Sequence, residues 1–493
     1  MLSIALLALL APAFAVAQQL GGVEAELKEP TDQQVYQRDE RGRAPIPVRL
    51  EAKKGEAKIR DAHVLVKKGS DPNTPPSFEV EGVEFADGVL KNVPTGGPYE
   101  VRVMTEGGQE YAADDVFVGD LWVLAGQSNM EGYGDLTDVA PPHEKVMALG
   151  MDGEWRRAEE PLHWLVDSPD PIHSGDPSDR EQRSKQQHKN RRKGAGLGLP
   201  FATAMVEATG VPVGLIPCAH GGTSMEQWSP SKKDEGGKSL YGSMIRQIKL
   251  AGGKVKGVLW YQGESDANEK AAKEYPKAFA DFIRAVRRDL DEPALPFYYV
   301  QIGRVVGPMF DAKHWNAIQE AQRTLPDRVA NTAVVAAVDL ELDDLIHVGV
   351  QGHKRLGKRL AGVALRELFS HGDGRSAPNL DRVTRVGNHT LHVKFKGINE
   401  SKQGDGTVFG LWRGDHHTGF SIRKADGTLV PLVYEATTAH GPPDTVTLKL
   451  NGDIPPGSFL WYGYGLDPAA VLTDQHDMAI PVFGPIALDD IGS

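Results

Sequence analysis

The chain has 493 residues, of which 40% are hydrophobic and 25% are charged, a composition typical of globular proteins. At roughly 100–200 residues per domain, this length predicts two to four domains with enough core to need no disulfide or structural metal. The formal net charge of −12 argues against nucleic acid or an anionic membrane surface as the main partner.

Residues 1–17 read MLSIALLALLAPAFAVA, an apolar run that is too short for a membrane span, which needs ~20 residues. Ala15 and Ala17 form an A-x-A arrangement before Gln18, which predicts a signal peptide cleaved after Ala17. We therefore expect a secreted or periplasmic protein; the alternative is a buried N-terminal helix. No later stretch is apolar enough to predict membrane insertion.

Residues 18–113 contain short alternating runs, such as AHVLVKK and YEVRVMT, that are broken by Gly and Pro. This pattern is typical of strands joined by tight turns and predicts an N-terminal β-rich, sandwich-like domain.

In residues 114–373 the pattern changes to nearly continuous apolar runs that alternate with helical stretches. The runs are VFVGDLWVLAG, VPVGLIPCA, KVKGVLWYQG, LPFYYVQIG and TAVVAAVDL. Strands buried on both faces read in this way, and strands alternating with helices predict an α/β domain with a parallel sheet and helices on both sides. Residues 374–493 return to short strands, such as HTLHVKFKG and DTVTLKL, and predict a C-terminal β-rich domain. The two β-rich domains either bind polysaccharide or only pack against the middle of the chain.

Polar residues follow the predicted strands of the α/β domain, where open sheets carry their sites. Gly126 allows a tight turn that exposes Ser128, although a serine here also fits an ordinary helix cap. The glycine pair at 221–222 leaves backbone N–H groups free, as an oxyanion hole requires and as ordinary turns also do. Asp344 and His347 are three residues apart, a spacing that lets a carboxylate orient an imidazole by its Nδ1–H.

The string GQSNM at 126–130 resembles the nucleophile block of SGNH hydrolases, in particular of their sialate O-acetylesterase-like group. GGTSMEQW, WYQGESD, and DDLIH followed by GHKRLGKRLA are similar to three further blocks, in the same order. The resemblance implies a flavodoxin-like three-layer α/β/α catalytic domain and a carboxylic ester hydrolase that acts on acetylated sugars, with no metal or cofactor.

Carried over residue by residue, the resemblance implies that Ser128 is the nucleophile, His347 the general base and acid, and Asp344 its orienting carboxylate. The oxyanion donors are then the backbone N–H groups of Ser128 and Gly222, with the amide of Gln262 where the wider family has asparagine.

Three further residues of these blocks, Gln127, Asn129 and Glu264, are expected to contact substrate or to support the catalytic groups. Val348 stands where the family usually has proline after the histidine. A long polar insertion, from about Asp167 to Arg192, is expected to reshape the substrate cleft.

Two alternatives keep part of this interpretation. The first is an esterase of the same fold that acts on a lipid or another small ester. Exposed apolar surface around Ser128 would favour this alternative. The second is a non-catalytic carbohydrate-binding protein. The oligomeric state and the identity of the sugar are not contained in these motifs.

Overall fold

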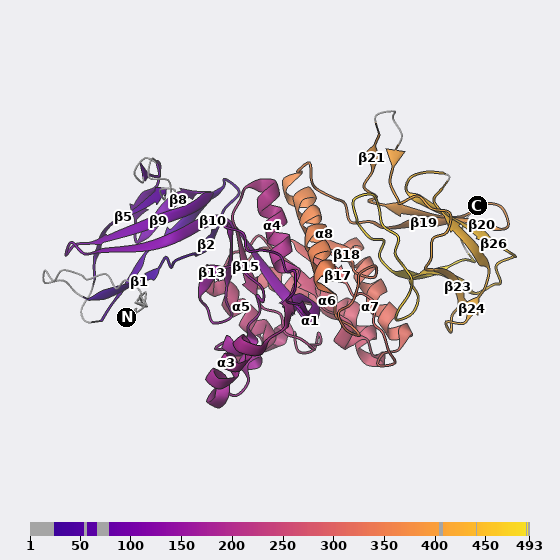
Figure 1. The fold of residues 1–493 in the computed structure, drawn as a ribbon, viewed down its shortest axis with the longest axis horizontal. Helices are drawn as coiled ribbons and strands as arrows, with labels where there is room; N and C mark the ends of the chain where they lie inside the picture. Colours follow the sequence, from indigo (N-terminus) through magenta and orange to yellow (C-terminus); the bar gives the residue numbers. More distant parts are fainter. Residues whose placement is uncertain are drawn as a thin grey trace, which may run out of the picture.

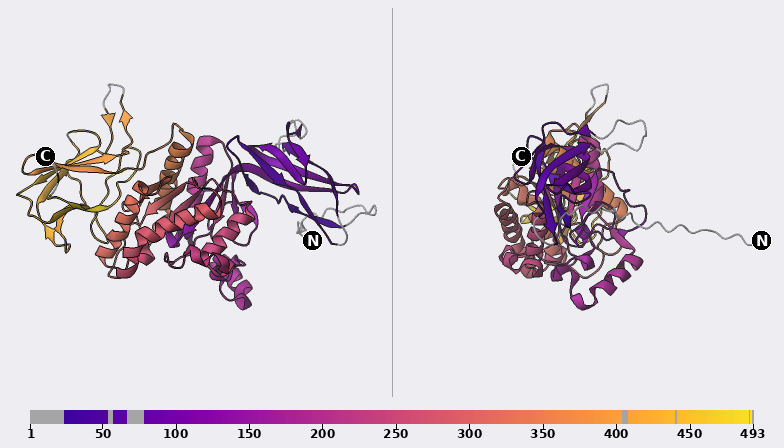
Figure 2. Two further views of the ribbon diagram at one scale, coloured as in Figure 1. Left: turned by 180° about the vertical axis from the view of Figure 1, so that it is seen from behind. Right: turned by 90° about the vertical axis from the view of Figure 1, so that its left-hand side faces the viewer.

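The computed structural model describes residues 24–53, 57–66, 78–403, 408–439, 441–489 and 491, so the expected signal peptide lies outside the described residues. The molecule is elongated, and three regions lie in a row along its long axis (Figure 1). The N-terminal strands lie at one end, the helices gather in the middle, and the C-terminal strands lie at the other end. The view from behind shows the same order (Figure 2).

The N-terminal region consists of mainly antiparallel strands around an apolar core of its own, and among its described strands only β2 pairs in parallel, with β10. Inward-facing residues of neighbouring strands, such as Val64, Val101 and Val103, are at most 1% exposed. Its strands are β1 (Ala25–Glu29), β2 (Val35–Gln37), β3 (Arg43–Pro47), β4 (Arg49–Ala52), β5 (Ile59–Val66), β6 (Phe78–Glu79), β7 (Glu84–Ala86), β8 (Val89–Pro94) and β9 (Gly96–Thr105).

A single strand, β10 (Glu110–Gly126), joins the N-terminal region to the middle of the molecule. Its first half pairs with β9 in antiparallel fashion, and its second half lies between two parallel partners, β15 (Val213–Pro217) and β16 (Gly257–Tyr261). The chain therefore passes residue 114 within a continuous strand. The apolar run VFVGDLWVLAG marks only the half that is buried among the helices.

The central sheet has the order β13-β12-β15-β10-β16-β17-β18. All neighbours run parallel except the edge strand β13, which makes the sheet mixed. The predicted α/β class is confirmed at this level, and strands occupy all five apolar runs; β12 and β13 are additional. The bounds are β12 (Val146–Leu149), β13 (Trp155–Arg157), β15 (Val213–Pro217), β16 (Gly257–Tyr261), β17 (Phe297–Gln301) and β18 (Thr332–Ala336).

Amphipathic helices cover this sheet with their apolar sides. In α6 (Glu269–Asp289), Tyr275, Phe279 and Phe282 recur at helical spacing, and Phe282 packs against Trp260 of β16 with ring centroids 4.6 Å apart. The side chain of Asn268 caps this helix at the Ala271 N–H. The other helices are α1 (Ser128–Glu131), α2 (Pro171–Ser174), α3 (Arg180–Asn190), α4 (Gly198–Thr209), α5 (Leu240–Leu250), α7 (Ala312–Thr324) and α8 (Val350–Phe369).

The C-terminal region contains two four-stranded antiparallel sheets, β19-β20-β26-β25 and β24-β23-β27-β28, with a separate apolar core. It is fastened to the middle region by Gln301, which accepts from the Val482 N–H and donates to the Val482 carbonyl oxygen at 2.8 and 2.9 Å. The strands are β19 (Asn379–Arg385), β20 (Thr390–Lys396), β21 (Ser401–Lys402), β22 (Val408–Phe409), β23 (Phe420–Lys424), β24 (Leu429–Val430), β25 (Val433–Thr437), β26 (Thr445–Leu450), β27 (Ser458–Tyr462) and β28 (Phe483–Ala487).

Among the described residues, no helix combines the length and the apolarity that a membrane span requires.

Candidate active site

Ser128 stands on a tight turn at the carboxyl end of β10. Gly126 has a φ of 136°, and a Cβ at this position would lie 2.2 Å from the carbonyl oxygen of Tyr261 in β16. Glycine is therefore required where the two strands meet, and the chain turns into α1 with Ser128 as its first residue. As a first helical residue, Ser128 has a backbone N–H without a partner inside the helix.

Asp344 and His347 lie on the loop between β18 and α8 and form a close pair. The two Asp344 carboxylate oxygens are 2.8 and 3.0 Å from His347 Nδ1. Asp344 also accepts the backbone N–H groups of Ile346 and His347 at 3.0 and 2.9 Å. Partial burial raises the pKa of Asp344, but these hydrogen bonds outweigh it and hold the pKa well below its usual range. The carboxylate is therefore charged at neutral pH and oriented toward the ring.

Asn129 connects the serine turn to the histidine loop. Its side chain is 1% exposed, its Oδ1 accepts the Val348 N–H at 3.0 Å, and its Nδ2 lies 3.4 Å from the Ile346 carbonyl oxygen. The backbone on both sides of His347 is therefore fixed to the residue that follows Ser128. No hydrogen bond joins the side chains of Ser128 and His347, although both residues are described; such bonds often tighten only when substrate binds.

Glu264 and Gln127 support the same turn from the β16 side. Asn129 Nδ2 donates to Glu264 Oε1 at 2.9 Å, and burial raises the pKa of Glu264 to about 7. Gln127 Oε1 faces the backbone N–H groups of Gly263 and Ser265 at 3.4 and 3.3 Å. Both side chains are at most 3% exposed, so they hold the site together and do not face a ligand.

Of the expected oxyanion donors, Gly222 and Gln262 lie in different surroundings. Gly222 has a φ of 69° and open space where a side chain would be, and its N–H donates to none of the described residues. Gln262 is fully buried, and its amide donates to the Thr223 carbonyl oxygen at 3.0 Å and to Asp266 Oδ2 at 2.5 Å. Both amide protons are used, so the structure does not support the expectation that Gln262 donates to an oxyanion.

Two residues that the motifs did not identify lie beside this site. The Tyr133 ring stacks on the His347 ring with centroids 4.3 Å apart. Glu131 Oε2 accepts the Gly221 N–H at 2.8 Å, and burial raises the pKa of Glu131 to about 7 despite Arg191 nearby. The only signal for them in the sequence is their closeness to Ser128, since Glu131 and Tyr133 follow it by three and five residues.

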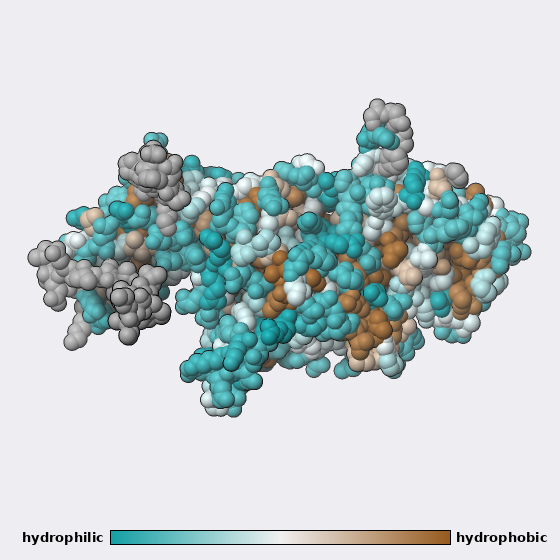
Figure 3. All heavy atoms as spheres, viewed as in Figure 1, coloured by the Kyte–Doolittle hydropathy of each residue, from teal (hydrophilic) through white to brown (hydrophobic). Residues whose placement is uncertain are grey.

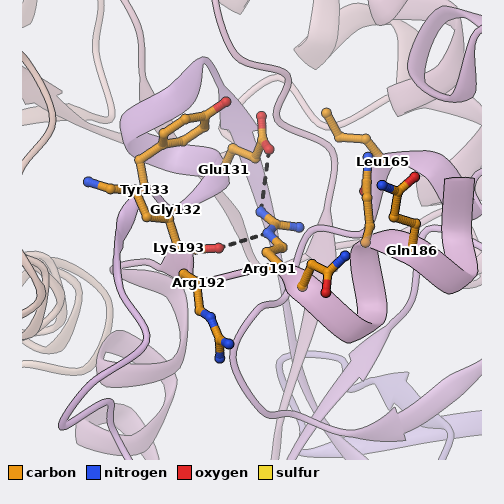
Figure 4. A pocket seen from close by; sticks show the side chains of 10 residues that line it. Glu131, Gly132, Tyr133, Leu165, Gln186, Arg191, Arg192 and Lys193 are labelled. Carbon is orange, nitrogen blue, oxygen red and sulfur yellow. Dashed lines mark hydrogen bonds and ion pairs between the residues drawn. The ribbon is translucent and has the colours of Figure 1, made fainter.

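A cavity of about 740 Å³ opens next to Tyr133, and we call it the Tyr133 pocket (Figure 4). Apart from Leu165 and Gly132, the residues that line it are polar, charged or aromatic, although the carbon atoms of their side chains form most of its surface. Within it, Arg191 lies 3.5 Å from Glu131 and donates to the Lys193 carbonyl oxygen at 2.8 Å. The lining residues are Glu131, Gly132, Tyr133, Leu165, Gln186, Gln187, Asn190, Arg191, Arg192 and Lys193.

Comparisons with known proteins bear on this geometry. The chain is 30% identical over 268 residues to a probable carbohydrate esterase of Arabidopsis thaliana, covering 90% of it and 50% of this chain. It is 24% identical over 296 residues to the sialate O-acetylesterase of Homo sapiens, covering 54% of that protein and 51% of this chain. A carbohydrate acetylesterase from Xanthomonas citri has the same fold, with a TM-score of 0.62 at 23% identity over 93% of this chain and 99% of that one.

The α/β fold and these comparisons define the chain as a carboxylic ester hydrolase. It belongs to the family of carbohydrate esterases described as sialic acid-specific acetylesterases, whose model matches residues 118–366. Family membership supports acetylesterase activity on carbohydrates, and the expected resemblance to this group is confirmed.

Proposed function

We propose that Ser128, His347 and Asp344 form the catalytic triad of a carbohydrate O-acetylesterase. The observation that carries the proposal is the double hydrogen bond of Asn129 to the backbone around His347. It fixes the Asp344–His347 pair next to the turn that presents Ser128. A nucleophile, a base and an orienting carboxylate in this order satisfy the requirements of acyl transfer.

In the first step, His347 Nε2 accepts the Ser128 proton while Ser128 Oγ attacks the acetyl carbonyl carbon. The tetrahedral oxyanion then accepts hydrogen bonds from the backbone N–H groups of Ser128 and Gly222. His347 returns the proton to the sugar oxygen, which leaves as the alcohol. Water then attacks the acetyl-enzyme with His347 again as base, and acetate departs as Ser128 regains its proton.

In this proposal Gln262 positions the oxyanion loop instead of donating to the oxyanion. Its amide holds the Thr223 carbonyl oxygen, one residue after Gly222, and is itself held by Asp266. Glu131 fixes the same loop from the other side through the Gly221 N–H. The Gly222 N–H therefore keeps its direction without a third donor.

Most side chains that line the Tyr133 pocket end in amide or charged groups, and these groups favour a sugar over a lipid as the alcohol half of the ester, because hydroxyl groups need hydrogen-bonding partners where water is displaced. One observation favours the alternative ester. Val306 and Leu345 are 38% and 53% exposed, and the Val306 N–H donates to the Leu345 carbonyl oxygen two residues before His347. An esterase of longer acyl chains would use such a surface.

The test is acetate release from acetylated xylan, an O-acetylated sialoside and an aryl acetate, with an aryl butyrate alongside, by wild type and Ser128→Ala. We expect the variant to lose activity by roughly 10³-fold or more on every substrate that the wild type hydrolyses. Equal activity of the two proteins would refute the role of Ser128. Preference for the butyrate over all acetates would favour the alternative ester.

Two finer features belong to the proposal. We propose a three-layer α/β/α arrangement for the catalytic region between sandwich-like β regions, supported by its central parallel strands and the separate apolar cores at either end. We also propose export, supported by the apolar run and the A-x-A pattern of residues 1–17.

A further inference from the structure

The polar insertion contributes a helix that the core does not need. No residue of α3 is buried, and the helix projects from the body of the molecule as a hydrophilic arm (Figures 1 and 3). A helix without an apolar face gains nothing from core packing, which provides most of the stability of helices in proteins. Its position must therefore be maintained by other contacts.

Those contacts come from residues three or four positions apart, on one side of α3 and just after its end. Ser184 and His188 both bind the carboxylate of Asp167, at 2.6 and 2.8 Å. The His188 ring also stacks on Trp164 with centroids 3.8 Å apart. Arg191, just after the helix, also lies over the Trp164 ring, with its guanidinium carbon 5.1 Å from the ring centroid. These polar and ring contacts fix the helix in one orientation.

The neighbouring side of α3 faces the Tyr133 pocket and carries three side-chain amides: Gln186, Gln187 and Asn190. None of these amides makes a hydrogen bond within the part of the chain that the structure describes, so their donors and acceptors are available to a ligand. Figure 4 shows Gln186 across the pocket from Tyr133. Side-chain amides both donate and accept, which matches the hydroxyl groups of a sugar.

The pocket lies beside His347, the residue that is proposed to protonate the leaving alcohol. Tyr133 separates it from His347 by one stacked ring, and Lys193 on its edge lies 3.5 Å from Asp344 Oδ2. Because His347 must protonate the leaving sugar oxygen, the sugar has to depart past this imidazole.

We propose that the Tyr133 pocket is a leaving-group subsite for an oligosaccharide, with the amide face of α3 binding sugar units beyond the acetylated one. The inference rests on the proposed function and deepens it. A cavity of about 740 Å³ lies in the upper half of the range typical of ligand sites, and its amides extend over more than one helical turn. α3 is then a specificity-determining element of this chain.

The test compares wild type with Gln186→Ala/Gln187→Ala/Asn190→Ala on an aryl acetate, an acetylated monosaccharide, acetylated xylotetraose and an O-acetylated sialyl-trisaccharide. We expect a fall of about tenfold or more in kcat/KM on at least one oligosaccharide, mainly through KM, and no change on the two small substrates. The xylotetraose is neutral and the sialyl-trisaccharide carries a carboxylate, so the pair shows which of these two kinds of oligosaccharide the pocket binds. Gln182→Ala, on the same helix but outside the pocket, is the matched control and should behave as wild type.

Equal kcat/KM values of the triple variant and wild type on both oligosaccharides would overturn the inference while leaving the triad intact. An equal loss on all four substrates would overturn it too, because it would show damage to the reacting centre. A second measurement does not depend on catalysis: calorimetric titration of Ser128→Ala with deacetylated xylotetraose and with the deacetylated sialyl-trisaccharide. We expect the triple substitution, added to Ser128→Ala, to weaken binding of the preferred one by about tenfold. Unchanged affinity for both would overturn the inference even if the proposed triad is also wrong.

Discussion

Asn129 holds the backbone on both sides of His347, accepting the Val348 N–H at 3.0 Å and lying 3.4 Å from the Ile346 carbonyl oxygen. The two residues are more than 200 positions apart in the sequence, yet this amide determines where the imidazole stands relative to the next residue, Ser128. His347, the proposed catalytic base, is thus positioned from the Ser128 turn as well as by Asp344.

Asn129→Ala should lower kcat by about 10²-fold with little change in KM, because a base displaced by a fraction of an ångström no longer reaches the nucleophile. The buried backbone groups left without partners should also cost about 1–3 kcal/mol of unfolding free energy. Asn316 is the matched control, since it is equally buried and accepts the Gly465 N–H at 2.9 Å but makes no hydrogen bond to the described backbone around His347. Asn316→Ala should lose stability but keep kcat; a similar loss of kcat in both would contradict the positioning role.

Asp344→Asn should lower kcat/KM on an aryl acetate by roughly 10³–10⁴-fold, since an amide neither selects the reactive tautomer nor stabilises the imidazolium. Asp343 provides the control, because it accepts the Asp135 N–H at 2.7 Å and does not contact the His347 ring. Steady-state rates of Asp343→Asn should stay within a few-fold of wild type. Comparable losses in the two variants would show that loop structure, and not the carboxylate at 344, is what matters.

The sequence predicted the buried core of the fold because strands covered on both faces read as continuous apolar runs. It did not reveal β12, a strand of only four residues, or β13, the strand at the sheet edge. It also did not reveal the polar first half of β10, since that half pairs with β9 outside the helical layer. Burial on two faces leaves a pattern in the chain, whereas pairing at an edge leaves almost none.

For the candidate site, the sequence predicted contacts between residues close together in the chain, but not contacts between distant segments. Asp344 and His347 are three residues apart, so their contact follows from spacing alone. Whether the Gln262 amide is free depends on Thr223 and Asp266, and the former comes from a different strand end. The stacking of Tyr133 on His347 likewise joins two distant segments, and no motif encodes it.

Glu264 predicts a measurable pH dependence of stability. Burial raises its pKa from 4.5 to about 7, so between these values the folded state binds more protons than the unfolded state. Stability therefore falls as pH rises from about 4.5 to about 7, by an amount on the order of 3 kcal/mol when complete. Its Oε2 has no partner among the described residues, as expected for a site built around the neutral acid.

Glu264→Gln replaces the carboxylic acid with a neutral group of the same shape and should remove this contribution. Thermal unfolding at pH 5 and pH 8 should show a smaller loss of melting temperature in the variant than in wild type. Glu131, whose pKa is raised in the same direction, contributes equally to both proteins and cancels in the comparison. Identical differences between the two pH values in wild type and variant would show that Glu264 does not titrate in this range.

The C-terminal region should depend on a buried ion pair for its attachment. Arg359 of α8 has a side chain 2% exposed and binds both oxygens of Asp339, whose side chain is 3% exposed, at 2.7 and 2.8 Å. Its Nε also donates to the Asp477 carbonyl oxygen of the C-terminal region at 2.6 Å. Removing the Arg359 side chain leaves the buried Asp339 carboxylate without its buried positive partner.

Arg359→Met should lower the unfolding free energy by about 3–5 kcal/mol, measured by urea denaturation. Arg355→Met removes a 36% exposed partner of the same carboxylates and should cost only about 1 kcal/mol. Adding Asp339→Leu to Arg359→Met should recover part of the loss, because the uncompensated charge disappears with it. If the double variant is instead less stable than Arg359→Met alone, Asp339 stabilises this junction by contacts other than its pairing with Arg359.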